Sequence, residues 1–173
     1  GAYSSASGYG NTSSAYYSAA YGIKNTASSN GSSAFGRKNI SSAASSSAFG
    51  FLNLASGIQS SAFGNTSTST GLQSSAVGYR NLATGFLSSA FGASSTASAN
   101  YANAIGYENE ASGLASAALG MQNTSSGDNS IAFGRGNLTS ASAASAFGYS
   151  NTASASNAIA FGRNNNATGP YAQ

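Results

Sequence analysis

The chain has 173 residues, of which nine are charged, and it contains one Pro and no Cys, His or Trp. Without Cys or His it has no thiol chemistry, disulfides or usual zinc ligands, and the only carboxylates, Glu108, Glu110 and Asp128, leave few candidates for acid–base catalysis or calcium binding. A formal charge of +3 is too small for the phosphate neutralisation that nucleic-acid binding requires. We therefore expect no enzyme, no catalytic or metal site, no cofactor and no nucleic-acid partner.

A strict repeat argues against the flexible linker that abundant Ser, Gly and Asn would otherwise suggest. Glycine recurs every 14 residues from Gly8 to Gly162 without insertion or deletion, and each is called here the main glycine of its repeat. Ala stands two residues earlier in every copy, and a large apolar residue lies between them from the second copy on. The first copy has Ser7 there. Positions in each repeat are counted from the main glycine below.

The rest of the repeat predicts one coil of a β-solenoid. Positions +5 and +7 hold small residues, and position +6 holds Ser or Thr in every copy. Asn stands at +3 in ten of twelve copies, with Ser67 and Ser95 as exceptions. Asn and Gly are typical of turns because both accept positive φ. Fourteen residues suit two strands of about five residues and two short turns, stacked about 4.8 Å apart. One large apolar position per repeat does not fit a helix.

Strand alternation separates the faces of each coil. Positions −4, −2 and 0 carry Ser or Ala, Ala, and Gly, and positions +5 and +7 are also small, so we expect a thin interior of small residues with the large residue at −1 outside. The alternative is an ordinary core of aromatic residues, but the second strand offers no apolar row to pack on them.

An exposed apolar strip of this length favours burial by another chain. Its burial contributes on the order of 15–30 kcal/mol per chain before entropy. The sequence thus predicts a homo-oligomer interface formed by Tyr21, Phe35, Phe49, Phe63, Val77, Phe91, Ile105, Leu119, Phe133, Phe147 and Phe161.

Cations and aromatic residues gather at positions +1 and +2. Because such mixtures are enriched at binding sites, we hypothesise that this edge contacts an anionic or extended polymeric ligand. The alternative is that these turns merely tolerate long side chains, which add solubility or pack between protomers. The candidate binding residues are Lys24, Arg37, Lys38, Arg80, Arg135, Arg163, Tyr79, Tyr107 and Tyr149, beside Tyr9 and Phe51.

The units Ser-Ser-Ala-Phe-Gly at 32–36, 60–64 and 88–92, Asn-Ser-Ile-Ala-Phe-Gly at 129–134 and Asn-Ala-Ile-Ala-Phe-Gly at 157–162 resemble the YadA-like head of trimeric autotransporter adhesins, as does the Asn that follows most main glycines at +3. The resemblance covers the whole chain. It implies a left-handed parallel β-roll and a homotrimer packed through the apolar row. Phe is commoner in this row than the family's usual Ile or Val, which suggests a wider or differently packed axis.

The resemblance also implies a location and an activity. Such heads lie at the distal part of a fibre on the outer membrane of Gram-negative bacteria, where they attach the cell to host matrix proteins, host cells or abiotic surfaces and so serve virulence. We expect residues 1–173 to be a single β-roll head segment of about twelve 14-residue repeats, part of a longer fibre whose signal peptide, neck, stalk and membrane anchor lie outside it. Membrane contact would come only through that anchor.

Two other functions stay open. Outward Thr and Ser at +4 and +6, as in Thr26 and Ser28, resemble the ice-binding faces of some antifreeze β-solenoids. The +4 row is however interrupted by Ile40, Leu54, Leu82, Glu110, Leu138 and Asn166. The second alternative is a purely structural spacer in a surface fibre.

Overall fold

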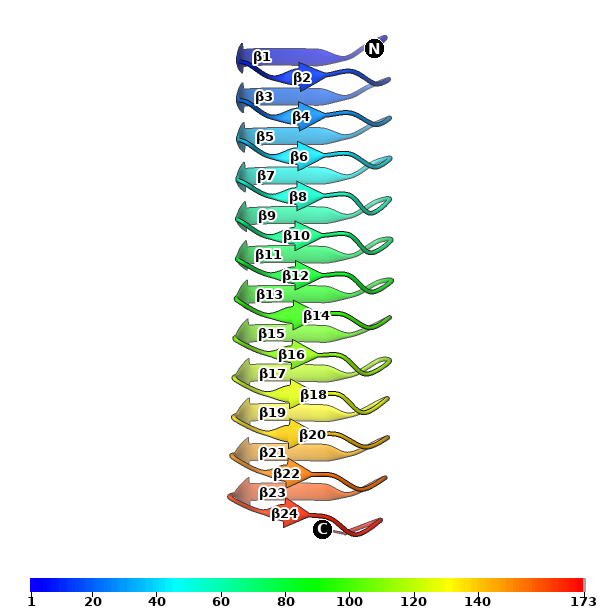
Figure 1. Cartoon of the computed structure of the whole chain (residues 1–173), viewed down its shortest axis with the longest axis vertical. Coiled ribbons are helices and arrows are strands. Elements are labelled where there is room, and N and C mark those ends of the chain that lie inside the picture. Colours follow the sequence, from blue (N-terminus) through cyan, green and yellow to red (C-terminus); the bar gives the residue numbers. More distant parts are fainter. Residues whose placement is uncertain (173) are drawn as a thin grey trace. The chain divides into compact units, whose positions relative to one another are not determined.

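Each repeat forms one coil of a parallel β-solenoid in the computed structural model, which describes residues 1–172 (Figure 1). A five-residue strand ends one residue after the main glycine, and a two-residue strand follows at +4 and +5. Neighbouring strands pair in parallel with a 14-residue offset, so Phe35 pairs with Phe49. The prediction of an all-β solenoid with 14-residue coils is confirmed. None of the described residues lies in a helix, so no membrane-crossing helix is found among them.

The chain divides into two compact units, the first being Gly1–Leu87. Its two sheets have the strand orders β1-β3-β5-β7-β9-β11 and β2-β4-β6-β8-β10-β12. The long strands are β1 (Ser5–Tyr9), β3 (Ala19–Ile23), β5 (Ser33–Arg37), β7 (Ser47–Phe51), β9 (Ser61–Asn65) and β11 (Ser75–Tyr79). The short strands are β2 (Thr12–Ser13), β4 (Thr26–Ala27), β6 (Ile40–Ser41), β8 (Leu54–Ala55), β10 (Thr68–Ser69) and β12 (Leu82–Ala83).

The second unit, Ser88–Gln173, repeats this plan. Its sheets have the orders β13-β15-β17-β19-β21-β23 and β14-β16-β18-β20-β22-β24. The long strands are β13 (Ser89–Ala93), β15 (Asn103–Tyr107), β17 (Ala117–Met121), β19 (Ile131–Arg135), β21 (Ser145–Tyr149) and β23 (Ile159–Arg163). The short strands are β14 (Thr96–Ala97), β16 (Glu110–Ala111), β18 (Thr124–Ser125), β20 (Leu138–Thr139), β22 (Thr152–Ala153) and β24 (Asn166–Ala167).

The second strand of each coil is two residues long, so the expectation of about five was wrong. The chain turns immediately after +5, and a hydrogen bond from the residue at +10 to the carbonyl at +7 closes the turn, as from Ser46 N to Ala43 O at 3.2 Å. Such a turn occupies four residues. It therefore leaves no room for a longer strand in a 14-residue coil.

The interior of each unit is thin and is filled by small side chains. Ala34, Ala48 and Ala62 at −2 are fully buried, and they face buried Ala or Ser at +5 of the short strands. The aromatic residues at −1 lie outside, so the structure does not have the aromatic core that was the alternative. The expectation that the main glycines line the interior was wrong, because they are half-buried or exposed where the chain bends out of the long strand.

Asn at +3 lies in the turn after the long strand, as expected, but it is buried and is the largest residue of the interior, and the positive φ expected of it was wrong. Asn25, Asn39 and Asn53 are essentially inaccessible to solvent and do not have positive φ. The left-handed conformation is adopted instead at +2 and +9, mostly by other residue types such as Leu52 (φ 56°) and Gln59 (φ 57°). In the turn after the long strand, the left-handed residue at +2 therefore lies beside the interior Asn.

The main glycine is required by its backbone conformation and by a close approach. Gly50 has φ 118°, which side-chain-bearing residues rarely adopt, and a Cβ there would collide with the carbonyl oxygen of Gly64 in the next coil. Small size at this position thus allows successive coils to stack.

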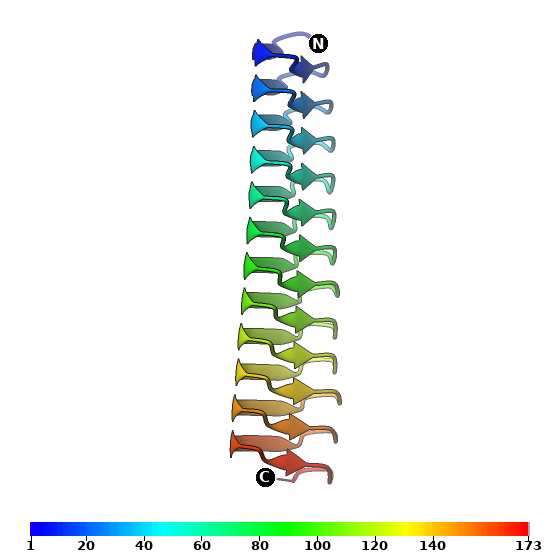
Figure 2. The same ribbon diagram turned by 60° about the vertical axis from the view of Figure 1, so that its left-hand side comes forward.

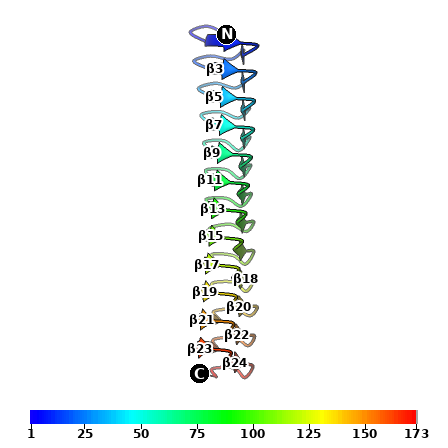
Figure 3. The same ribbon diagram turned by 90° about the vertical axis from the view of Figure 1, so that its left-hand side faces the viewer.

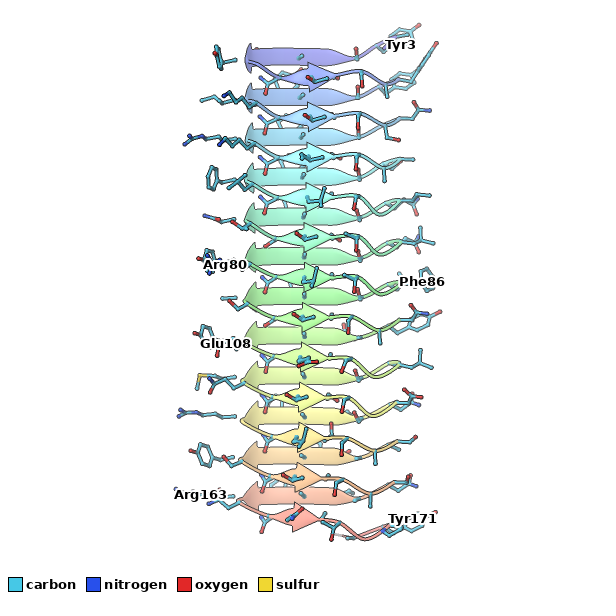
Figure 4. The ribbon with its side chains drawn as sticks, viewed as in Figure 1. Tyr3, Arg80, Phe86, Glu108, Arg163 and Tyr171 are labelled. Atoms are coloured by element: carbon cyan, nitrogen blue, oxygen red, sulfur yellow. The ribbon has the colours of Figure 1, made fainter. Side chains whose placement is uncertain are left out.

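Within each unit, the long and short strands form two layers joined by turns (Figures 2 and 3). The turn at +1 to +3, after the long strand, is called here the cation edge. The turn at +7 to +10, after the short strand, is called the opposite edge. The outer faces of the two sheets lie between these edges, and both edges carry long side chains (Figure 4).

Candidate functional site

The backbone of the cation edge is held by a ladder of Asn side chains. Asn39 Nδ2 donates to the carbonyl oxygens of Phe35 in its own coil, at 2.8 Å, and of Gly50 in the next, at 2.7 Å. Asn39 Oδ1 accepts from the backbone N of Asn53 at 3.0 Å, and Asn25 Oδ1 accepts from Asn39 N at 3.0 Å. Each buried Asn thus connects its coil with both neighbours and fixes the bend that presents +1 and +2.

The outer face of the long-strand sheet carries the apolar row. In the first unit the rings of Tyr21, Phe35, Phe49 and Phe63 stack in order, with centroids 5.0, 4.7 and 5.0 Å apart. The rings cover one another along the stack but leave one side open, so all four are half-buried or exposed in the isolated chain. The register thus converts one aromatic residue per coil into a continuous apolar surface.

In the second unit the same position is at least as open. Ile105 is 43% exposed and Phe133 is 53% exposed. All eleven residues expected at an interface lie at outward positions of the long strands, and none is buried in the single chain. Sequence reasoning missed Ile131 and Ile159, which lie at −3 on the same face and are 38% and 39% exposed. Most other copies have Ser at −3, so the sequence does not show an apolar row at this position.

The six basic residues all project from the cation edge and are exposed (Figure 4 labels Arg80 and Arg163). In the first unit, the Arg37 guanidinium lies 5.4 Å from the ring centroid of Phe51 in the next coil, and the Arg80 guanidinium lies 5.1 Å from that of Tyr79. Both distances are within the range of cation–π attraction. The expected mixture of cations and aromatic residues is therefore organised into pairs, with Lys24 and Lys38 beside them.

The cation edge of the second unit carries charges of both signs. Arg135 and Arg163 lie 5.6 and 5.4 Å from the ring centroid of Tyr149. The carboxylate of Glu108 accepts a hydrogen bond from Gln122 Nε2 at 2.9 Å. Glu108 also raises the pKa of Tyr107, first through a hydrogen bond to the hydroxyl and then through its charge.

The opposite edge holds a tyrosine cluster that sequence reasoning missed. Tyr3 and Tyr17 stack with centroids 5.2 Å apart, and Tyr16 packs edge-on to Tyr17 at 5.6 Å. All three are at least half exposed. The available signal was the 14-residue spacing of Tyr3 and Tyr17, which places them in adjacent coils.

Among residues 1–172, no group of three His, Cys, Asp or Glu side chains is placed to hold a metal ion. Within each unit, the described surface offers a row of apolar side chains on one sheet face, and edges that present one or two side chains per coil. Linear surfaces of this kind suit contact with other extended chains.

The fold and these surfaces define a repetitive, parallel β-solenoid whose features recur coil by coil. A family model for the YadA head domain repeat, which holds two copies of the repeat, matches residues 55–81, 83–109, 111–137, 140–165 and 156–172. The first three matches begin 28 residues apart, the length of two coils. Because the matches cover more than half of the chain, it belongs to the YadA head family. No curated protein matches the chain.

Proposed function

We propose that this chain is a non-enzymatic, trimeric head segment of a bacterial surface adhesin. Family membership indicates a surface-exposed adhesin of Gram-negative bacteria. The apolar row is the observation that supports assembly with other copies, and the number of three comes from the family: the row lies outside a core that is already complete and is open to solvent in the single chain. Monomeric proteins rarely expose a strip of this kind. A left-handed coil and a rotational axis along the row follow from the family.

Attachment would be multivalent. The solenoid repeats similar edge positions in every coil, and a trimer would display each edge three times. Many weak contacts then add up to firm attachment without one strong site. Host matrix proteins, host cells and abiotic surfaces are the proposed targets.

Solution mass tests the trimer. The purified chain should have three times its 16.9 kDa monomer mass. The double variant Phe49→Ser, Phe63→Ser should weaken the trimer while β-rich circular dichroism remains, because it interrupts the row but not the core. The double variant Leu72→Ser, Leu87→Ser removes similar apolar area from the opposite edge and should leave the mass unchanged. A stable monomer of the unaltered chain would contradict the proposed interface.

Attachment is tested with the trimer coated on beads, by counting beads retained on immobilised matrix proteins, on cultured cells and on polystyrene. Retention above that of albumin-coated beads is expected on at least one surface. If the coated beads were retained no better than albumin-coated beads on every surface, the result would favour the spacer function instead. Nothing in the geometry favours ice binding, since the +4 row is broken by exposed Ile40 and Leu138.

A further inference from the structure

Charge is distributed unevenly between the two units. Residues 1–87 contain four basic side chains and no Asp or Glu, whereas all three carboxylates of the chain lie in residues 88–173. The four cations, Lys24, Arg37, Lys38 and Arg80, all lie on the cation edge of the first unit and are exposed. This edge is therefore a line of uncompensated positive charge.

The geometry of this line restricts the partner. Lys24 lies one coil from the pair Arg37 and Lys38, about 5 Å along the stack, and Arg80 lies three coils further, about 15 Å. The line is only one or two side chains wide in each coil. A linear polyanion can follow such a line along its length, whereas a flat anionic membrane would contact only the outermost part of the edge.

The aromatic residues distinguish between linear polyanions. Proteins that bind single-stranded nucleic acid offer open aromatic faces on which bases stack. Here Arg37 lies over the ring of Phe51 and Arg80 over the ring of Tyr79. One face of each of these two rings is therefore occupied, and each ring supports a guanidinium whose N–H groups remain available for oxyanions.

We propose that the cation edge of the first unit binds a linear sulfated polysaccharide. Sulfate groups would be held by Lys24, Arg37, Lys38 and Arg80 through charge-assisted hydrogen bonds. The inference rests on the proposed function only in placing the chain at a cell surface, where such polymers are met. It assigns a ligand class to the edge and does not depend on how the apolar row is covered.

The test measures heparin binding by the whole chain and two double variants. Arg37→Asn, Lys38→Ser removes two positive charges and uses residue types that occupy the same positions in other coils, at Asn65 and Ser94. Asn30→Asp, Gln59→Glu lowers the net charge equally, but on the opposite edge. Its new carboxylates retain the hydrogen bonds from Tyr16 N and Gln73 Nε2, as native Asp128 accepts from Leu114 N.

We expect the dissociation constant for heparin to rise about tenfold in the Arg37, Lys38 variant and less than about twofold in the control. Arg37→Lys alone should retain most of the binding. Chemically desulfated heparin should bind much more weakly to the unaltered chain, and oligothymidylate should bind more weakly than heparin.

Several outcomes would overturn the proposal: equal losses in the two double variants, undiminished binding of desulfated heparin, or tighter binding of oligothymidylate. Solution mass and bead retention are recorded on the same preparations. If the heparin result contradicts the polysaccharide proposal while the trimer mass and the bead retention are as expected, the proposed head function is unaffected. The failures of the two proposals are therefore distinguishable.

Discussion

Asn39 donates a hydrogen bond from Nδ2 to the carbonyl oxygen of Gly50, across the gap between two coils, at 2.7 Å. This contact joins the two most regular features of the repeat, the Asn at +3 and the main glycine. Gly36, the main glycine in the coil of Asn39, leaves room for the Gly50 carbonyl oxygen, with which a Cβ on Gly36 would collide, and Asn39 donates to that carbonyl. The two residue types therefore recur together, because the glycine allows the close approach of the next coil and the Asn hydrogen-bonds the carbonyl that comes close.

Removing one member of this ladder should destabilise the chain strongly. Asn39→Ala removes the side-chain hydrogen bonds to the carbonyls of Phe35 and Gly50 and from the backbone N of Asn53, which we expect to cost about 3 kcal/mol of unfolding free energy. The measurement is urea denaturation followed by circular dichroism at fixed protein concentration.

Two further variants calibrate that loss. Asn39→Ser should cost less, because Ser67 fills the same position naturally and still donates to Gly78 O, although at 3.3 Å. Asn65→Ala, at an exposed site one residue after a main glycine, should have little effect. Equal losses at residues 39 and 65 would contradict the role of the ladder.

Paired and unpaired core serines should respond to truncation with opposite sign. Ser46 Oγ bonds Ser41 Oγ at 2.6 Å, whereas Ser60 Oγ is buried without a hydrogen-bond partner, and its coil has Ala55 in the position of Ser41. Ser46→Ala should destabilise by about 1–2 kcal/mol and Ser60→Ala should stabilise by up to about 1 kcal/mol.

The same urea titration measures both serine variants. Ala55→Ser gives a third test, because it should provide Ser60 with the partner that Ser46 already has. Destabilisation by Ser60→Ala would show that the Ser60 hydroxyl is satisfied in solution.

Two glycine substitutions should differ sharply. Gly50→Ala combines an unfavourable φ with a backbone collision against Gly64, and we expect a loss of about 3 kcal/mol or more. Gly31 also has positive φ, 66°, but nothing lies closer than 3.5 Å to its added Cβ, and Ser45 occupies the same position one coil later. Gly31→Ser should therefore change stability by less than about 1 kcal/mol in thermal unfolding.

The titration of Tyr107 should report its contact with Glu108. The neutral phenol donates to the carboxylate, and the negative charge opposes ionisation, so both effects raise the pKa of Tyr107. The hydrogen bond is present at lower pH and is lost as the pH rises through this raised pKa. Glu108→Gln should lower the pKa of Tyr107, as measured by NMR of ring-labelled tyrosine. An unchanged pKa would mean that the two side chains do not meet in solution.

The 14-residue register predicted most of the scaffold. Alternation around the main glycines separated buried Ala34 from outward Phe35, and the spacing of Arg37 and Arg80 placed them on one edge. The role of Asn39 could not be predicted, because a single sequence does not distinguish a turn Asn that adopts positive φ from a turn Asn whose side chain is buried in a hydrogen-bond ladder. The ring partners depend on side-chain direction: Arg80 lies over its own neighbour Tyr79, whereas Arg37 reaches Phe51 in the next coil.

The left-handed residues at +2 and +9 have a consequence for diversification. These positions hold Lys, Leu, Thr, Arg, Glu, Gln, Tyr and Ala in different coils with nearly constant φ. The backbone there is held by neighbouring coils and not by the side chain itself. Substitutions at these sites can therefore accumulate without altering the scaffold, so selection can change what the edges display while the architecture is inherited unchanged.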